Sequence, residues 1–265
     1  MIATGRVFQL VALVFIVVVI YYAVHMTKRG RKFKLRSIAG LDAIPEAVGR
    51  ATEMGGTVVV IPGIGGLVGG GLGGATEAAE TLAGLSVLGY TTSLVAKYGA
   101  KIVAGICKPE VMPLAEETVK QAFLAAGKPQ DFKPEMVRFL SGDQWGVATA
   151  IMGILQREKV AANIMIGYFA GEALALAESA AAVGAIQVAG TATNIGQNAW
   201  FATICDYVLI GDEVYAAGAI LSQDPEQIGT LAGQDVPKLL AIGLVAIGTV
   251  LGLLKSNILL DILKR

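Results

Sequence analysis

Histidine is the residue that this sequence most nearly lacks. The 265-residue chain contains one histidine, His25, which lies at the end of a long apolar run. Catalysis by a Ser-His-Asp or Cys-His arrangement in the polar part of the chain is therefore excluded within one chain, and so is a zinc site built on histidine.

Cysteine is nearly as scarce. Cys107 and Cys205 lie about 100 residues apart, and no CxxC spacing occurs. Both fall in apolar, strand-like stretches, which indicates buried structural thiols rather than a disulfide or a metal site. We therefore expect no metal and no cofactor, and catalytic residues cannot be assigned.

Charge is also low, at 16% of residues against about 25% in an average globular chain. The net charge is zero, but residues 37–236 contain twenty acidic and ten basic residues. Nucleic-acid binding needs a basic face, so an acidic domain of this kind is a poor candidate for it. Six basic residues instead precede this domain: Lys28, Arg29, Arg31, Lys32, Lys34 and Arg36.

The first long apolar run predicts an N-terminal transmembrane anchor, residues 1–26. Residues 7–26 carry no charge, and twenty helical residues span about 30 Å, the thickness of a bilayer core. The basic neck, residues 27–36, should stay in the cytoplasm and attract anionic lipid headgroups, with the N-terminus outside the cell membrane. A cleaved signal peptide is the alternative, but no A-x-A site follows and the charge is on the wrong flank.

The C-terminal segment, residues 237–265, contains a second apolar run at 239–254. Sixteen helical residues span about 24 Å, which is short for a full crossing. Gly248 and Gly252 form a small-xxx-small pair of the kind found at helix contacts. We expect this helix to cross the membrane; the alternative is a helix packed on the anchor or lying in the interface.

Between the two apolar ends, residues 37–236 alternate between helix and strand signals. This order predicts an α/β domain with a mostly parallel sheet and helices on both faces. A rival reading makes 81–106 and 159–190 further membrane spans, but the charged residues in them make that costly. The predicted strands are 57–61, 101–106, 163–169, 186–190 and 201–210; the predicted helices are 45–54, 76–98, 113–126, a helix capped by Asp143 and running to about 161, 171–183, and one starting at Asp212.

A glycine-rich segment, residues 62–74, lies between a predicted strand and a predicted helix. Gly69, Gly71 and Gly74 match G-x-G-x-x-G, a pattern that lets a pyrophosphate approach a helix N-terminus. The match begins eight residues after the strand, however, and no acid for a ribose follows between 81 and 109. The alternative is a close-packed loop that seats against a neighbouring subunit.

Three acidic residues are further candidates for ligand binding. Asp206 interrupts the predicted strand 201–210, and Asp212 and Glu213 follow it. Ligands of open α/β sheets bind at the carboxyl ends of strands. A solvated helix start explains Asp212 and Glu213 equally well, and Asp206 is more typical of a structural bond, with Arg50 or Arg138 as a suggested partner.

Two stretches, 36–58 (RSIAGLDAIPEAVGRATEMGGTV) and 205–235 (CDYVLIGDEVYAAGAILSQDPEQIGTLAGQD), resemble a family of bacterial and archaeal membrane-anchored proteins known only as a domain of unknown function. The resemblance covers about 36–238. It implies the layout of neck and domain and a prokaryotic source, and it brings no activity.

Three functions remain open from sequence. The leading hypothesis is a self-associating structural or scaffold protein, forming a homo-oligomer or part of a larger complex with other membrane proteins, because an anchor raises effective concentration. A second hypothesis is a nucleotide- or phosphometabolite-binding enzyme using the segment 62–74. A third is an accessory subunit of a transporter or channel, although the scarcity of polar residues in the two apolar helices argues against a conducting path.

Overall fold

The computed structural model describes residues 7–31, 38–68 and 75–253 of the chain. It divides into two compact units. One unit, Arg36–Ser222, is an α/β domain; the other joins the two ends of the chain, Met1–Leu35 and Gln223–Arg265.

The α/β domain is built on a six-stranded sheet in the order β3-β2-β1-β4-β5-β6, and every neighbouring pair is parallel. Because the two central strands are covered on both faces, their residues are mostly apolar, and all seven residues of β1 are buried. The strands are β1 (Thr57–Gly63), β2 (Lys101–Ile106), β3 (Val137–Phe139), β4 (Val160–Tyr168), β5 (Ile186–Thr191) and β6 (Tyr207–Ile210).

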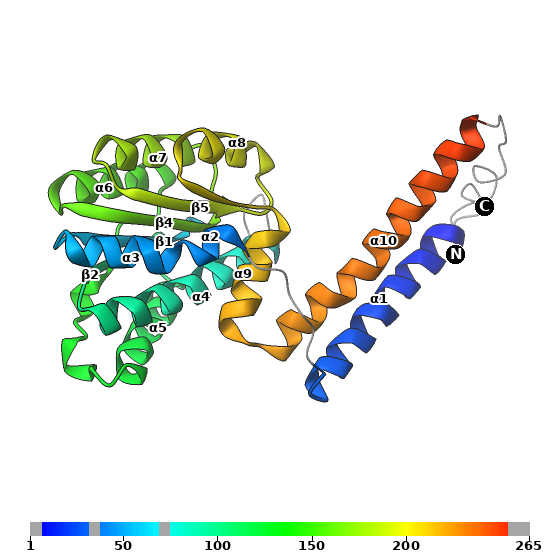
Figure 1. Cartoon of the computed structure of the whole chain (residues 1–265), viewed down its shortest axis with the longest axis horizontal. Coiled ribbons are helices and arrows are strands. Elements are labelled where there is room, and N and C mark those ends of the chain that lie inside the picture. Colours follow the sequence, from blue (N-terminus) through cyan, green and yellow to red (C-terminus); the bar gives the residue numbers. More distant parts are fainter. Residues whose placement is uncertain (1–6, 32–37, 69–74, 254–265) are drawn as a thin grey trace. The chain divides into compact units, whose positions relative to one another are not determined.

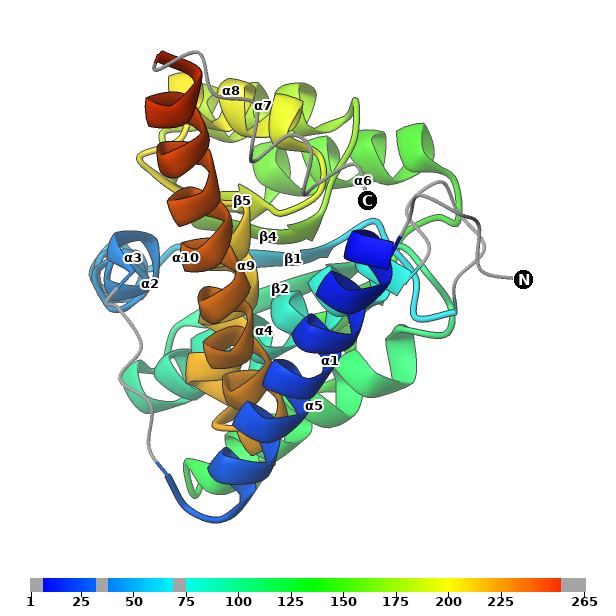
Figure 2. The same cartoon turned by 90° about the vertical axis from the view of Figure 1, so that its right-hand side faces the viewer.

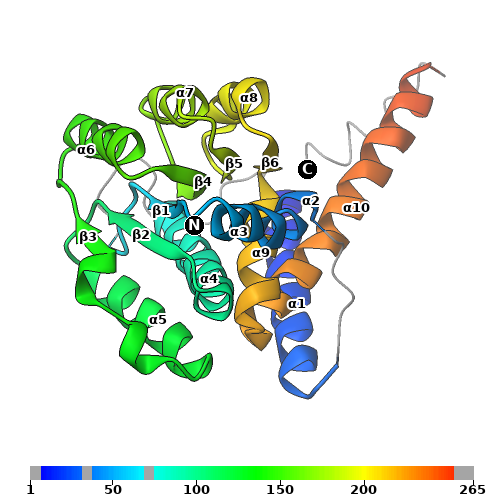
Figure 3. The same cartoon turned by 60° about the vertical axis from the view of Figure 1, so that its left-hand side comes forward.

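Helices cover both faces of this sheet, as Figures 1 and 3 show. One apolar cluster packs α3 (Ile44–Glu53), α4 (Ala75–Tyr98), α5 (Met112–Ala125) and α9 (Asp212–Ser222) on one face. A second cluster packs α6 (Gln144–Arg157), α7 (Ala173–Ala182) and α8 (Ile195–Ile204) on the other. The short helix α2 (Ala39–Asp42) precedes α3, and two single turns, η1 (Pro129–Asp131) and η2 (Pro134–Met136), precede β3. The predicted fold class is confirmed.

Local signals explain where several helices begin and end. The carboxylate of Asp143 accepts a hydrogen bond from the amide of Gly146 at 2.8 Å, so it caps α6 as the sequence predicts. Pro113 lies in the first turn of α5, and Gly127 follows its end with a φ of +72°. The helix α6 ends at Arg157 rather than near 161, because β4 begins at Val160.

The prediction of one strand over 201–210 is wrong. Residues 195–204 form α8, and only 207–210 form a strand. A parallel connection from β5 to β6 needs a crossover, and α8 supplies it. Asp206 therefore precedes β6 instead of interrupting it.

The second unit is a pair of long apolar helices, α1 (Val7–Lys28) and α10 (Pro225–Leu253), and Figure 2 shows both along their length. Both are long and apolar enough to cross a membrane. The helix α10 contains the predicted apolar run 239–254 up to Leu253, and it begins earlier, where Asp224 accepts from the amide of Glu226 at 2.9 Å. The predicted boundary at 236–237 thus falls within α10.

Candidate functional site

The two central strands, β1 and β4, send their following connections to opposite faces of the sheet. The chain runs from β1 to α4 on one face and from β4 to α7 on the other. In open parallel sheets, ligands bind at the carboxyl ends of strands beside such a switch point. The carboxyl edge of β1 and β4 is therefore the candidate site.

Two glycines hold the ends of β1 and β4 in backbone contact. Gly63 has a φ of +94°, and a Cβ there would lie 2.6 Å from the amide nitrogen of Tyr168. Gly167 has a φ of +151°, and a Cβ there would lie 2.2 Å from the carbonyl oxygen of Pro62. Only glycine fits both positions, so backbone fills the space where the two strands end.

The start of the glycine-rich segment also packs against its own neighbours. A Cβ at Gly65 would lie 3.0 Å from Oγ1 of Thr81, and one at Gly66 would lie 2.6 Å from Oε1 of Glu110. The described part of this segment is thus a close-packed connection between β1 and α4.

The glycines of the G-x-G-x-x-G match, Gly69, Gly71 and Gly74, lie outside the described residues. The possibility that they bind a ligand stays a prediction.

Glu80 is a buried carboxylate that joins α4 to the connection between β5 and α8. Its Oε2 accepts hydrogen bonds from the hydroxyl of Thr191 at 2.9 Å and the amide of Ala192 at 2.8 Å. Its Oε1 accepts from the amide of Thr193 at 3.1 Å and from the hydroxyl of the same residue. Four donors that would suit an anionic ligand thus bind the chain's own carboxylate.

A second buried carboxylate, Glu172, follows β4 on the other side of the switch point. Its Oε1 accepts from the amide of Ala170 at 2.9 Å, and its Oε2 accepts from Nε2 of Gln144. These bonds tie the start of α7 to the start of α6. Each oxygen already has a donor within the chain, so the structure gives Glu172 a positioning role.

Burial suppresses ionisation of the two thiols and of one phenol in the domain. Burial, with the charge of Glu172 adding to it, raises the pKa of Cys107 to about 12, and burial with Asp206 does the same for Cys205. Burial, then the charges of Glu80 and Asp212, raises the pKa of Tyr215 to about 12. These groups stay protonated near neutral pH, so neither thiol is an activated nucleophile. Both cysteines are free.

The three acidic candidates from sequence are not brought together. Asp206 precedes β6, and its Oδ2 accepts from the amide of Gln187 at 2.8 Å. Asp212 and Glu213 follow β6 at the opposite edge of the sheet, where Glu213 accepts from the amide of Ile210 at 3.2 Å. Within residues 7–31, 38–68 and 75–253, no three His, Cys, Asp or Glu side chains are placed to hold a metal ion.

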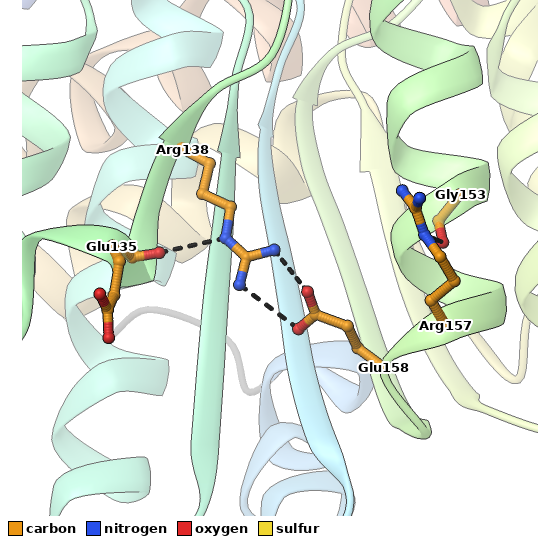
Figure 4. A network of polar contacts seen from close by, with 5 residues as sticks. All are labelled: Glu135, Arg138, Gly153, Arg157 and Glu158. Atoms are coloured by element: carbon orange, nitrogen blue, oxygen red, sulfur yellow. Dashed lines mark hydrogen bonds and ion pairs between the residues drawn. The ribbon is translucent and has the colours of Figure 1, made fainter.

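Arg138, the suggested partner of Asp206, pairs with Glu158 instead. Figure 4 shows its guanidinium pointing to that carboxylate, while its Nε donates to the carbonyl of Glu135 at 3.1 Å. Arg157 beside them donates to the carbonyl of Gly153 in its own helix at 2.9 Å. The pair joins β3 to the connection between α6 and β4, at the amino edge of the sheet.

The two apolar helices are antiparallel and meet at glycines of α10. A Cβ at Gly229 would lie 2.6 Å from Cα of Val24, and one at Gly233 would lie 2.8 Å from Cα of Ile20. The partner residue number falls by four as the glycine number rises by four, which defines the antiparallel direction. Sequence reasoning missed this G-x-x-x-G pair, although its spacing is that of Gly248 and Gly252.

Those two predicted packing residues, Gly248 and Gly252, lie farther along α10, and their role in helix packing stays a prediction. Of the basic neck, Lys28 forms an ion pair with Glu226 at 2.6 Å, and Arg29 and Arg31 follow the end of α1. Lys32, Lys34 and Arg36 lie outside the described residues.

A comparison with known protein families places this chain. The family model described as "Domain of unknown function (DUF6754)" matches residues 1–263. The chain belongs to this family. The match covers both apolar helices as well as the α/β domain. No curated protein and no solved structure matches the chain.

One helix of this DUF6754 domain has an outer face without charge. The ten residues of α8 include no acidic or basic side chain, and Ile195 and Trp200 are 69% and 47% exposed. Tyr207 and Ile210 of the adjoining edge strand β6 are also exposed. Exposed apolar side chains that gather on one element are typical of an interaction site. We call Ile195, Ala199, Trp200 and Thr203 the α8 surface.

Proposed function

We propose that this protein is a membrane-anchored scaffold whose α/β domain self-associates through the α8 surface. The observation that carries the proposal is the exposure of Ile195 and Trp200 on a helix without charge. Residues 38–222 contain seventeen acidic and ten basic residues, so two copies of the domain repel over most of their surface. The α8 surface lets two acidic copies meet without bringing like charges together.

The two apolar helices provide the anchor in this proposal. Because α1 and α10 are antiparallel, they would place the start of α1 and the end of α10 on one side of the membrane, and the end of α1 and the start of α10 on the other. The basic residues after α1 favour the cytoplasmic side for the domain. Anchoring confines the copies to two dimensions, which favours a weak contact between them.

Self-association is tested on the full chain extracted in mild detergent. Native mass spectrometry should show an oligomer for the unaltered protein and mainly monomer for Ile195→Glu combined with Trp200→Glu. The matched control is Leu114→Glu combined with Leu124→Glu, which adds the same charge at two apolar side chains of α5 that are 44% and 52% exposed, and it should leave the oligomer intact. A monomeric unaltered protein, or equal loss of oligomer in the control, would overturn the proposal.

A second candidate function is binding of a nucleotide or phosphometabolite at the carboxyl edge. The strand order favours it, because 3-2-1-4-5-6 is the order of dinucleotide-binding sheets and the glycine-rich segment follows β1. One observation argues against ligand binding there: the four hydrogen-bond donors that could bind an anion already donate to the carboxylate of Glu80. A thermal-shift screen decides: saturation at 100-fold over Kd should add about 2.7 kcal/mol, and the absence of a shift with every nucleotide would remove this candidate.

A further inference from the structure

The basic side chains of the α/β domain gather at one edge of its sheet. All six strands are parallel, so every connection from a helix to the next strand lies at the amino edge. Seven of the ten basic residues in 38–222 lie in these connections or within two residues of them. The strand-to-helix connections at the opposite edge carry one, Lys108, beside a group of acids: Glu77, Glu110, Asp143, Glu172, Asp212 and Glu213.

Helix dipoles contribute to this separation, because acids favour helix starts and bases favour helix ends. The dipoles do not explain why the amino edge also exposes apolar groups. Met54, directly after α3, is 68% exposed, and Tyr98, the last residue of α4, is 43% exposed. The ammonium of Lys97 lies 5.6 Å from the centre of the Tyr98 ring.

The basic groups converge around the start of β1. Thr57 pairs with Lys101 of β2 on one side, and its amide donates to the carbonyl of Lys159 at 3.0 Å on the other. Neighbouring strands are about 4.8 Å apart, so the two lysine backbones lie within roughly 10 Å of each other. Arg157 precedes this second lysine by two residues. We define the amino-edge patch as Met54, Lys97, Tyr98, Lys101, Arg157 and Lys159.

Few carboxylates oppose this patch. Glu53, at the end of α3, lies on the same connection as Met54. Glu158 is engaged by Arg138 and does not neutralise the lysines. Asp131, Glu135 and Asp206 belong to the outer connections, which lead to β3 and β6.

We propose that the amino-edge patch docks the domain on an anionic bilayer surface. Lysines and arginines provide attraction to anionic headgroups, and an exposed methionine and tyrosine suit the interface itself. The proposal rests on the membrane anchoring put forward above, since the anchor keeps the domain within reach of lipid. A nucleic acid is a poorer partner, because the acidic remainder of the domain repels an extended polyanion. The acidic carboxyl edge would face away from the lipid.

The test uses the full chain reconstituted into vesicles of phosphatidylcholine, alone or mixed with phosphatidylglycerol. A donor dye is attached at Glu135→Cys on the amino edge or at Val68→Cys near the carboxyl edge, in a Cys205→Ser background, and the acceptor is on lipid headgroups. Energy transfer from position 135 should rise with phosphatidylglycerol, and transfer from position 68 should not. The rise should fall by about half or more in 1 M salt, where the Debye length is about 3 Å.

Charge variants test whether the amino-edge patch causes the rise in energy transfer from position 135. Lys101→Glu with Lys159→Glu should abolish the rise. Lys108→Glu with Lys120→Glu, which changes the charge equally but away from the amino edge, should retain most of it. A rise at both dye positions, or at neither, would overturn docking through this edge. The Trp200→Glu chain should show the same lipid effect, so failure of self-association and failure of lipid docking are distinguishable. Release of the chain by alkaline carbonate would remove the anchoring and the docking together.

Discussion

Glycines bring backbones together in both compact units of this chain, but the surroundings of the contacts differ. In the α/β domain, Gly84 of α4 lies against backbone of β1 and β4, and buried apolar and polar side chains enclose it. In the helix pair, Gly233 of α10 lies against α1, while Val17 and Leu240 on the same helices are exposed.

The two units differ in what covers their apolar side chains. The domain completes its own core and satisfies even its buried carboxylates. The helix pair leaves its apolar side chains uncovered, and a bilayer would cover them. The following four predictions separate the two units, because each substitution should affect one and spare the other.

The largest effect is expected at Glu80, which the domain buries with four donors. Glu80→Ala leaves the buried hydroxyl of Thr191 and the buried amide of Ala192 without their acceptor, and we expect a loss of about 3 kcal/mol or more in the free energy of unfolding. Urea unfolding followed by circular dichroism measures it. Glu178→Ala, an exposed site on α7, should change stability by less than about 0.5 kcal/mol. Equal effects of the two variants would show that the Glu80 contacts do not stabilise the domain.

Two glycine-to-alanine substitutions in the domain should change its stability in opposite directions. At Gly84, a Cβ would lie 2.4 Å from the carbonyl oxygen of Ile166, so Gly84→Ala should destabilise by about 2 kcal/mol. At Gly49 of α3 nothing lies within 4 Å, and Gly49→Ala should stabilise by about 0.5–1 kcal/mol through helix propensity. Thermal or urea unfolding of both variants measures these changes. A change in the free energy of unfolding of the same sign for both variants would contradict the close packing of α4.

A substitution in the helix pair should change the contact between α1 and α10 and leave the stability of the α/β domain unchanged. Gly233→Leu should force α10 away from Ile20 at a cost of roughly 1 kcal/mol of helix association, without moving the unfolding midpoint of the domain. The distance between spin labels at Tyr22 and Leu240 in lipid nanodiscs reports the separation. Gly243→Leu is the control, because nothing lies within 4 Å of Gly243. An unchanged distance distribution in the Gly233 variant would show that this glycine does not set the helix contact.

The smallest effect is expected at Arg138. Its side chain and that of Glu158 are 37% and 31% exposed, so water weakens the pair, and Arg138→Ala should cost less than about 1 kcal/mol. Arg157→Ala, which removes only a bond within α6, should cost less still. Urea unfolding at low and high salt measures both. A cost of several kcal/mol for Arg138→Ala would mean that the pair organises the amino edge.

Strong local signals made most of the fold predictable. The β-branched run at 57–61, the prolines and acids at helix starts and the glycines at helix ends each act over a few residues. The helix α8 was missed because Ile195–Ile204 has no charged face to reveal a helical period, and its aromatic and branched residues favour a strand. The bond between Glu80 and Thr191 joins residues 111 apart in sequence, and no local pattern marks it. Gly229 and Gly233 could have been found from their spacing alone.

The central claim is that the two apolar helices hold this chain in a membrane with its domain on the inner side. Protease treatment of sealed cells, followed by alkaline carbonate washing of the isolated membranes, tests it most directly. We predict that the domain survives external protease and that the intact chain stays in the membrane pellet. Digestion of the domain from outside, or release of the intact chain by carbonate, would contradict the account.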